Sequence, residues 1–337
     1  MSSKIKFAIV GCGSIGKRHL AVLDSEEEAE IVAICDSVEE RVKELSNLYN
    51  GIKAFTSYSK MLEEIDADVI NVVTPHHLHA SMTVEALNKG FNVLVEKPMA
   101  LKSSDCRSMI DAANANKKKL WVVKQNRYNI PIRLAKEALE NNRLGNIFIV
   151  KCDILWNRYQ GYYDESPWRG KKEFEGGALY TQASHFIDLL VWWFGDLIES
   201  KSIMETQNHR IETEDSGISV LRFANGTLGN LIWTTCVYNK NYEGSITIVG
   251  ERGTIKIGGQ YLNKIEYWDV EGYPLPEGIE FTDKPNAYGK YQGTSSNHDK
   301  VIKSIISQIK GRSFETVDGY EGIKSINAIE MLYGNSK

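Results

Sequence analysis

The 337-residue sequence lacks the cysteine pattern of a disulfide framework or a structural zinc site. Three of its five cysteines lie in or beside apolar runs, where a free cysteine behaves as a small hydrophobic residue. Scattered cysteines without a CxxC pair favour a reducing, cytoplasmic setting. The five are Cys12, Cys35, Cys106, Cys152 and Cys236.

Hydrophobic runs long enough to cross a bilayer are also missing. The most apolar long stretch, residues 185–198, carries Asp188 and Asp196 and is too short for a membrane span, so we expect a core helix there. The chain begins MSSKIKFAIV and enters a strand-like segment at once, from which we expect no signal peptide.

Positively and negatively charged residues are nearly balanced in number. A formal net charge of −4 gives no overall attraction to nucleic acid or to an anionic membrane, so we expect neither partner. Apolar residues make up 42% and charged residues 25%, the balance of an ordinary soluble globular protein. The length suggests two domains.

Residues 1–124 alternate between strand-like and helix-like segments. Helix-like stretches such as SVEERVKELSNLY separate short, largely apolar runs. This alternation with short connections predicts an α/β domain with a parallel, doubly wound sheet. The strand-like runs are residues 6–11, 30–36, 52–55, 68–74, 92–97 and 119–123.

The pattern changes after Arg127, and we assign residues 125–337 to a second domain. Apolar and polar residues alternate from 199 to 268, with Asn225-Gly226 as a hairpin turn, which predicts an antiparallel sheet. The other expected elements are a helix at 132–142, a strand at 145–156, an aromatic loop at 157–176, an apolar helix at 179–194, and helices near 296–310 and 320–333.

The segment AIVGCGSIGKRHL carries Gly11, Gly13 and Gly16 in a G-x-G-x-x-G pattern between a strand and a helix. The glycines permit a tight turn and close backbone approach, so that a pyrophosphate can lie at the helix N-terminus. Asp36 ends the next strand, where a carboxylate can bind both ribose hydroxyls and repels a 2′-phosphate. We therefore expect NAD rather than NADP, although Arg41 leaves that preference open. Further candidates in this binding set are Ser14, Ile15, Ser37 and Arg41.

Three histidines fall within four residues in VVTPHHLHA, residues 72–80. In a doubly wound sheet the end of the fourth strand faces the cofactor crevice, so Thr74, Pro75, His76 and His79 are candidates for cofactor contact. A solvated helix start is the first alternative. A metal site is the second, and it is disfavoured because no acidic or cysteine partner lies nearby in sequence.

Lys97 stands where the buried run Asn92-Val93-Leu94-Val95 ends, directly before Pro98. Ligands bind beyond the carboxyl ends of such strands, and burial there lowers the pKa of a lysine. A lysine so placed can donate to a substrate hydroxyl or help remove its proton. The alternative is a surface Lys-Pro pair that only ends the strand.

These motifs, with the later pattern GG-A-x-x-x-x-x-SH-x-x-D, resemble the Gfo/Idh/MocA oxidoreductases along the whole chain. The resemblance implies an N-terminal Rossmann domain and a C-terminal α/β domain with an open, mostly antiparallel sheet. It also implies that Lys97 touches both the nicotinamide and the reacting sugar carbon, and that Glu96 lies near the nicotinamide ribose. His185 takes the place of the catalytic histidine, although a lone histidine in an apolar helix also fits a packed core residue. Many polyol dehydrogenases of the family carry an aspartate where this chain has Thr181, which puts an inositol-type mechanism in doubt.

Finer features resemble one branch, the WlbA-type UDP-sugar 3-dehydrogenases. The segments that carry this likeness are VVKQNRYN (122–129), LWNRYQGYYDESPWRG (155–170) and YEGSITIVGERGTIKIGG (242–259). The resemblance adds cofactor and substrate candidates, whereas the alternative for the aromatic loop is a lid that packs on itself. The cofactor candidates are Gln125, Trp168 and Arg169, and the substrate candidates are Arg158, Gln160, Tyr163 and Gln182 beside Lys97 and His185.

The expected function is NAD-dependent oxidation of the C3 hydroxyl of UDP-N-acetylglucosaminuronate, on a route to surface polysaccharides. The alternatives are a UDP-N-acetylglucosamine 3-dehydrogenase, an inositol or simple-sugar dehydrogenase, and a non-catalytic sugar-sensing regulator. By the same resemblance we expect a homodimer or homotetramer formed through the C-terminal sheet.

Overall fold

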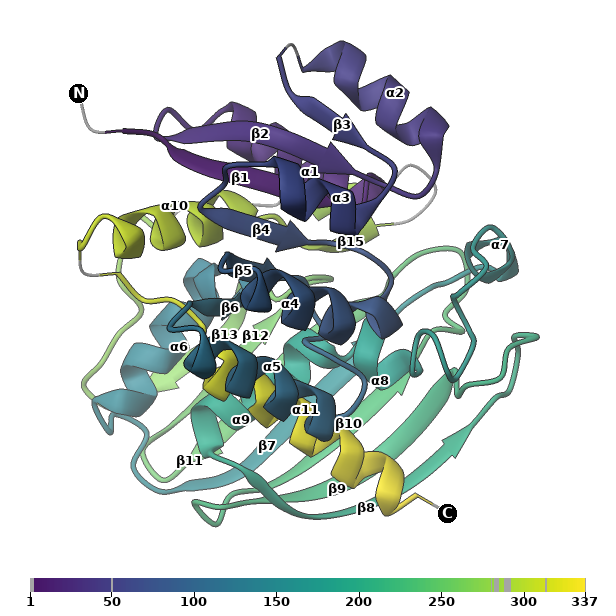
Figure 1. The fold of residues 1–337 in the computed structure, drawn as a ribbon. Helices are drawn as coiled ribbons and strands as arrows, with labels where there is room; N and C mark the ends of the chain where they lie inside the picture. Colours follow the sequence, from purple (N-terminus) through teal and green to yellow (C-terminus); the bar gives the residue numbers. More distant parts are fainter. Residues whose placement is uncertain are drawn as a thin grey trace. The chain divides into compact units, whose positions relative to one another are not determined.

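A computed structural model describes residues 3–49, 51–279, 281, 285–287, 292–312 and 314–336 (Figure 1). Contacts divide the chain into two units, and each unit is described separately. The first unit comprises Met1–Lys124 and His298–Ile323, and the second comprises Gln125–Asn297 and Lys324–Lys337.

The first unit is built on a six-stranded parallel sheet in the order β3-β2-β1-β4-β5-β6. The central strands β1, β4 and β5 are almost wholly buried, as their continuous apolar runs predict. This order places the switch point of a doubly wound sheet between β1 and β4, where ligands bind in such folds. The strands are β1 Ile5–Val10, β2 Ala29–Cys35, β3 Lys53–Phe55, β4 Val69–Val72, β5 Asn92–Val95 and β6 Leu120–Val122.

Helices connect these strands, as the sequence predicts, and the expected fold class is confirmed. Helix α1 packs against α10, and α4 packs against α5. The helices of this unit are α1 Ser14–Asp24, α2 Glu39–Leu48, α3 Tyr58–Glu64, η1 His76–Leu78, α4 His79–Asn88, α5 Ser103–Ala115 and α10 His298–Ile309.

The expected boundary after residue 124 coincides with the first division of the chain, but the prediction gave everything beyond it to the second domain. Residues 298–323 instead return to the first unit. The indole Nε1 of Trp121 donates to Gln308 Oε1 at 2.6 Å, and Lys310 Nζ forms an ion pair with Glu28 at 2.6 Å. These partners lie far apart in sequence, which is why a linear reading missed the return.

The second unit is built on a seven-stranded sheet in the order β13-β12-β11-β7-β10-β9-β8. Strands β7 and β10 pair in parallel, and the five other neighbouring pairs are antiparallel, so the expected mostly antiparallel sheet is confirmed. Gly226, with φ of +91°, forms the expected β9–β10 turn. The strands are β7 Ile147–Leu155, β8 Leu197–Glu205, β9 Ser216–Phe223, β10 Leu228–Thr234, β11 Glu243–Gly250, β12 Gly253–Gly258 and β13 Lys264–Val270, with a separate pair β14 Pro285–Ala287 and β15 Gln292–Ser295.

Helices cover one face of this sheet. Phe186 of α9 packs on Trp156 with ring centroids 5.7 Å apart, and Phe194 packs on Phe223 at 5.6 Å. The expected helix at 179–194 is divided in two, because the amide of Ala183 donates to Ala178 across one residue more than in an α-helix. Helical segments here are η2 Gln125–Tyr128, α6 Ile130–Glu140, α7 Gln160–Asp164, α8 Ala178–Thr181 and α9 Ser184–Phe194, and α11 Gly319–Gly334 begins in the first unit.

The opposite face of the sheet exposes large apolar side chains beside ion pairs such as that of Arg222 with Glu199. Ile203 on β8 pairs with Ile218 on β9, and Ile149 on β7 pairs with Leu228 on β10 and Val249 on β11. Each of the five is between 37% and 66% exposed. Among the described residues, no helix combines the length and hydropathy that a membrane crossing requires.

Candidate active site

The glycine-rich turn between β1 and α1 has the geometry of a phosphate cradle. Gly11 has φ of +105°, and a Cβ atom there would lie 2.6 Å from the carbonyl oxygen of Val73. A Cβ on Gly16 would collide with the Gly11 carbonyl, so the helix packs against the turn only with glycine at this position. Gly13 caps the helix without a side-chain hydrogen bond, and the space beside it is open. Ser14 and Ile15 follow in the first helical turn, whose amides can bind an anion.

Asp36 lies beside this turn, directly after β2. Its Oδ2 accepts the backbone N–H of Cys12 at 2.7 Å, and its Oδ1 accepts that of Val38 at 2.9 Å. The side chain is buried, whereas Ser37 is exposed. Arg41 Nη1 lies 3.6 Å from Asp36 Oδ2, so the carboxylate partly neutralises the positive charge that could attract the 2′-phosphate of NADP. The glycines and Asp36 therefore fit the pyrophosphate and ribose of NAD.

The histidines after β4 do not form a solvated helix start. His76 and His79 are buried, and only His77 of the three is exposed. The ring nitrogens of His79 lie 2.7 Å from the Pro98 carbonyl oxygen and 2.8 Å from that of Thr74. His79 thus ties the Thr74-Pro75 turn to the segment that follows Lys97. Burial lowers the pKa of His79, and the two carbonyl acceptors oppose that shift.

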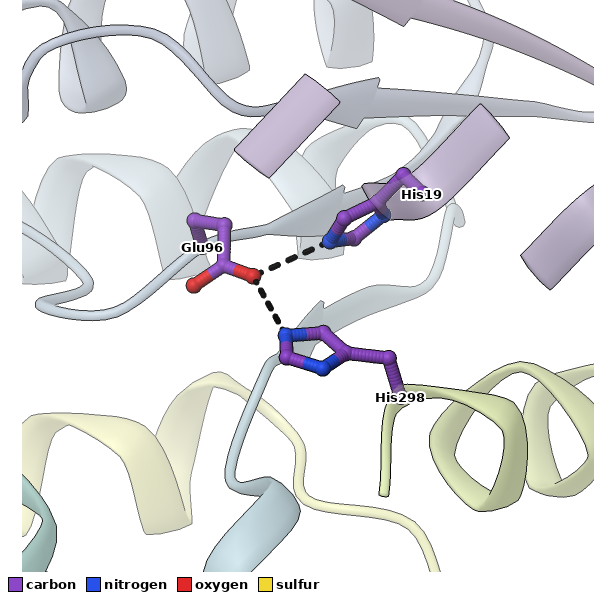
Figure 2. Close-up of side chains that lie close together, drawn as sticks. All are labelled: His19, Glu96 and His298. Carbon is purple, nitrogen blue, oxygen red and sulfur yellow. Dashed lines mark hydrogen bonds and ion pairs between the residues drawn. The ribbon is translucent and has the colours of Figure 1, made fainter. Parts of the chain in front are cut away.

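Glu96 points into the first unit (Figure 2). Its Oε1 is bound by His19 and His298, and its Oε2 accepts the backbone N–H of Lys97 at 3.0 Å. The expected contact of Glu96 with the nicotinamide ribose stays a prediction. The sequence analysis missed both histidines: His19 follows Gly16 by three residues on the buried face of α1, and His298 is 202 residues from Glu96.

His185 lies on α9, 3% exposed, with its Nε2 3.2 Å from Gln125 Nε2. The side-chain amide of Gln125 thus lies within hydrogen-bond distance of the His185 ring. One turn further, Asp188 binds Arg127 through two hydrogen bonds of 2.8 and 2.9 Å. The η2 segment therefore both contacts His185 and fixes its helix.

Thr181, which stands where many relatives have an aspartate, is linked to a carboxylate that the sequence analysis missed. Its hydroxyl donates to Oε1 of the buried Glu175 at 3.0 Å. Glu175 Oε2 accepts the backbone N–H of Gly170. Gly170 has φ of +70°, and a Cβ there would collide with Ile211. Glu175 thus holds the Trp168-Arg169-Gly170 turn against α8.

The aromatic loop is arranged around Tyr162, another residue that the sequence analysis missed. The guanidinium of Arg158 lies 5.3 Å from the Tyr162 ring and that of Arg169 lies 4.1 Å from it. Gln182 Nε2 donates to the Tyr162 hydroxyl at 3.4 Å. The loop therefore packs partly on itself, as the alternative expected, while it brings Arg158, Arg169 and Gln182 together.

The other loop candidates bind neighbouring protein groups. The Tyr163 hydroxyl lies 3.1 Å from Thr235 Oγ1, and Gln160 Nε2 donates to Asp164 at 2.9 Å. The carbonyl of Arg158 accepts from His209 Nε2 at 2.7 Å. Roles for Gln160 and Tyr163 toward a substrate stay predictions.

Family models match both units of the chain. The model described as "Oxidoreductase family, NAD-binding Rossmann fold" matches residues 5–124, and that described as "Oxidoreductase family, C-terminal alpha/beta domain" matches residues 136–337. Among curated relatives, D-glucoside 3-dehydrogenase of Escherichia coli is 28% identical, covering 100% of this chain and 96% of its own.

Two solved structures are similar over nearly the whole chain. The WlbA dehydrogenase of Bordetella pertussis, in complex with NADH and UDP-GlcNAcA, is 35% identical with a TM-score of 0.89, covering 98% of this chain and 96% of its own. The WlbA dehydrogenase of Chromobacterium violaceum, solved with the same two ligands, is 36% identical with a TM-score of 0.91, covering 99% and 94%. By these matches and by its glycine-rich turn and Asp36, the chain belongs to the Gfo/Idh/MocA family of NAD-dependent oxidoreductases.

Proposed function

We propose that this chain oxidises the C3 hydroxyl of UDP-N-acetylglucosaminuronate to the 3-keto sugar. The observation that carries the proposal is the buried His185, whose imidazole is a group that can act as a general base and whose Nε2 lies 3.2 Å from Gln125 Nε2. The likeness to two WlbA dehydrogenases solved with NADH and UDP-GlcNAcA supports the choice of substrate.

In this proposal His185 takes the proton of the C3 hydroxyl, and Lys97 donates to the same oxygen before the proton leaves. NAD, when bound, supplies the hydride acceptor. Arg158 binds the sugar carboxylate, for which a planar guanidinium is suited because it can bind two oxygens at once. Glu175 and Gln125 act indirectly, by holding the Trp168–Gly170 turn and the His185 ring.

Absorbance at 340 nm with NAD and a panel of sugars tests the proposal. We expect NADH formation with UDP-N-acetylglucosaminuronate, weaker formation with UDP-N-acetylglucosamine, and none with inositol. A preference for an unsubstituted sugar would reject the UDP-sugar assignment. A D-glucoside 3-dehydrogenase would then be the favoured function, because that relative matches along the full length of the chain.

Two further properties belong to the proposal. The exposed apolar face of the second sheet supports a homodimer or homotetramer, since an apolar surface of this extent on a soluble protein marks an interaction site. The free, mostly buried cysteines support a cytoplasmic location.

A further inference from the structure

Three buried side chains from distant parts of the sequence converge on one another (Figure 2), and one of them, Glu96, directly precedes Lys97 in the chain. His19 comes from α1, Glu96 follows β5, and His298 is the first residue of α10. Nε2 of His19 lies 3.0 Å and Nε2 of His298 3.3 Å from the same carboxylate oxygen, Glu96 Oε1. The three residues are 1%, 5% and 2% exposed, so water does not compete for these bonds.

Hydrogen bonds and burial act on the cluster together. The amide nitrogen of Asn71 lies 3.1 Å from His19 Nδ1, on the side of the ring away from Glu96. Burial raises the pKa of Glu96, but the bonds from His19 and His298 outweigh it and hold that pKa well below its usual range. Burial lowers the pKa of His298. The cluster is therefore one buried carboxylate that two histidines stabilise.

This carboxylate acts directly on the backbone of Lys97. Glu96 Oε2 accepts the Lys97 N–H at 3.0 Å, and the backbone N–H of Glu96 donates to the Val72 carbonyl at 2.9 Å. On the other side of the lysine, the Pro98 carbonyl is bound by His79 at 2.7 Å. Buried histidines thus hold the peptide group before Lys97, through Glu96, and the peptide group after Pro98 directly.

We propose that His19 and His298 are positioning residues for Lys97, acting through the carboxylate of Glu96. The two N–H groups hold Glu96 Oε1 in place. The other carboxylate oxygen, Oε2, is thereby held against the backbone N–H of Lys97, and this contact sets the direction of the lysine side chain. The same three ligand atoms lie close enough together to hold a metal ion. The two Nε2 atoms lie 3.0 and 3.3 Å from Glu96 Oε1, which are distances of direct hydrogen bonds, so the geometry points to hydrogen bonding instead.

The test compares three variants of the full-length protein. His298→Phe keeps the ring and removes the donor, His298→Gln restores an N–H, and His77→Phe changes an exposed histidine outside the cluster as a control. His298→Phe should lower kcat about 10- to 100-fold, the effect of a misdirected reacting group, with KM for NAD and sugar unchanged. His298→Gln should recover most of kcat, and His77→Phe should match the wild type.

A second readout does not depend on the sugar. Acetic anhydride labelling of Lys97, followed by peptide mass spectrometry, should rise in His298→Phe and return toward wild type in His298→Gln. Three results would each overturn the inference. The first is unchanged kcat and unchanged labelling in His298→Phe, and the second is an equal loss of kcat in the Phe and Gln variants. The third is a stoichiometric metal in the purified protein.

The inference rests on the proposed function only for the role of Lys97. Different results would reject the positioning role and the proposed function. Lys97→Ala with full turnover would reject the role of the lysine in the proposed function. Lys97→Ala without turnover, together with a fully active His298→Phe, would reject the positioning role alone. If no UDP-sugar is oxidised, the labelling of Lys97 still decides whether His298 positions it.

Discussion

Arg158→Met tests whether the Arg158 guanidinium binds the sugar carboxylate of the proposed substrate. Arg158 is 5% exposed, and its guanidinium lies 5.3 Å from the rings of both Trp156 and Tyr162. A charge-assisted hydrogen bond from such a group is worth roughly 1.5–3 kcal/mol. At ~1.4 kcal/mol per tenfold, this is a preference of about 10- to 100-fold for UDP-N-acetylglucosaminuronate over UDP-N-acetylglucosamine. Methionine keeps much of the stem and removes the charge, so the preference should largely disappear while turnover of the uncharged sugar is retained.

The assay is the ratio of kcat/KM for the two sugars, from absorbance at 340 nm. Arg222→Met is the matched control, because Arg222 is exposed and forms an ion pair with Glu199 on the sheet. Arg158 Nη1 also donates to the Asn157 carbonyl at 2.6 Å, so thermal unfolding should confirm that the variant is folded. A preference that survives in a folded Arg158→Met would show that another residue reads the carboxylate, and a wild-type preference for the uncharged sugar would refute the reasoning at its start.

Three other perturbations test separate features. Asp36→Ala should raise KM for NAD and narrow its preference over NADP, since the carboxylate selects a free 2′-hydroxyl; equal use of both cofactors by the wild type would contradict this. Burial raises the pKa of Glu214 from 4.5 to about 7, so the stability that its proton contributes below pH 4.5 is lost as pH rises through 7. That loss is about 3 kcal/mol at ~1.4 kcal/mol per pKa unit, and urea denaturation at pH 5 and pH 8 should show a smaller decline in Glu214→Gln than in the wild type. Ile218→Lys should convert the oligomer to a monomer in light scattering, and a monomeric wild type would contradict that expectation.

Local patterns made much of the first unit predictable. The strands of the parallel sheet are short apolar runs between helices, so their positions follow from sequence alone, and Gly11, Gly13 and Asp36 act within their own connections. The sequence also predicted a helix around His185, which lies at the start of α9, and its catalytic role stays a prediction.

The partners of these residues were not predictable in the same way. His298 forms a hydrogen bond with Glu96 across 202 residues of sequence, and we found no pattern near either residue that predicts this contact. Glu175 accepts the N–H of Gly170, five residues earlier, where the chain turns with a positive φ that the sequence analysis did not predict. Side-chain pairs formed by tertiary folding carry no local signal, so the sequence analysis did not predict these supporting contacts.

The return of residues 298–323 to the first unit has a consequence for synthesis of the chain on the ribosome. Strand β6 is completed late: the amide of Val122 donates to the carbonyl of Val317 at 2.9 Å, and Trp121 forms a bridge with Asp318. All of Gln125–Asn297, 173 residues, must be translated before the returning segment can appear. At about 5–20 residues per second this takes about 10 to 35 s, during which the edge of β6 has no neighbour from its own chain. Unpaired edges can pair with other strands, so this edge of β6 stays open to pairing with another chain until residues 317 and 318 have been made.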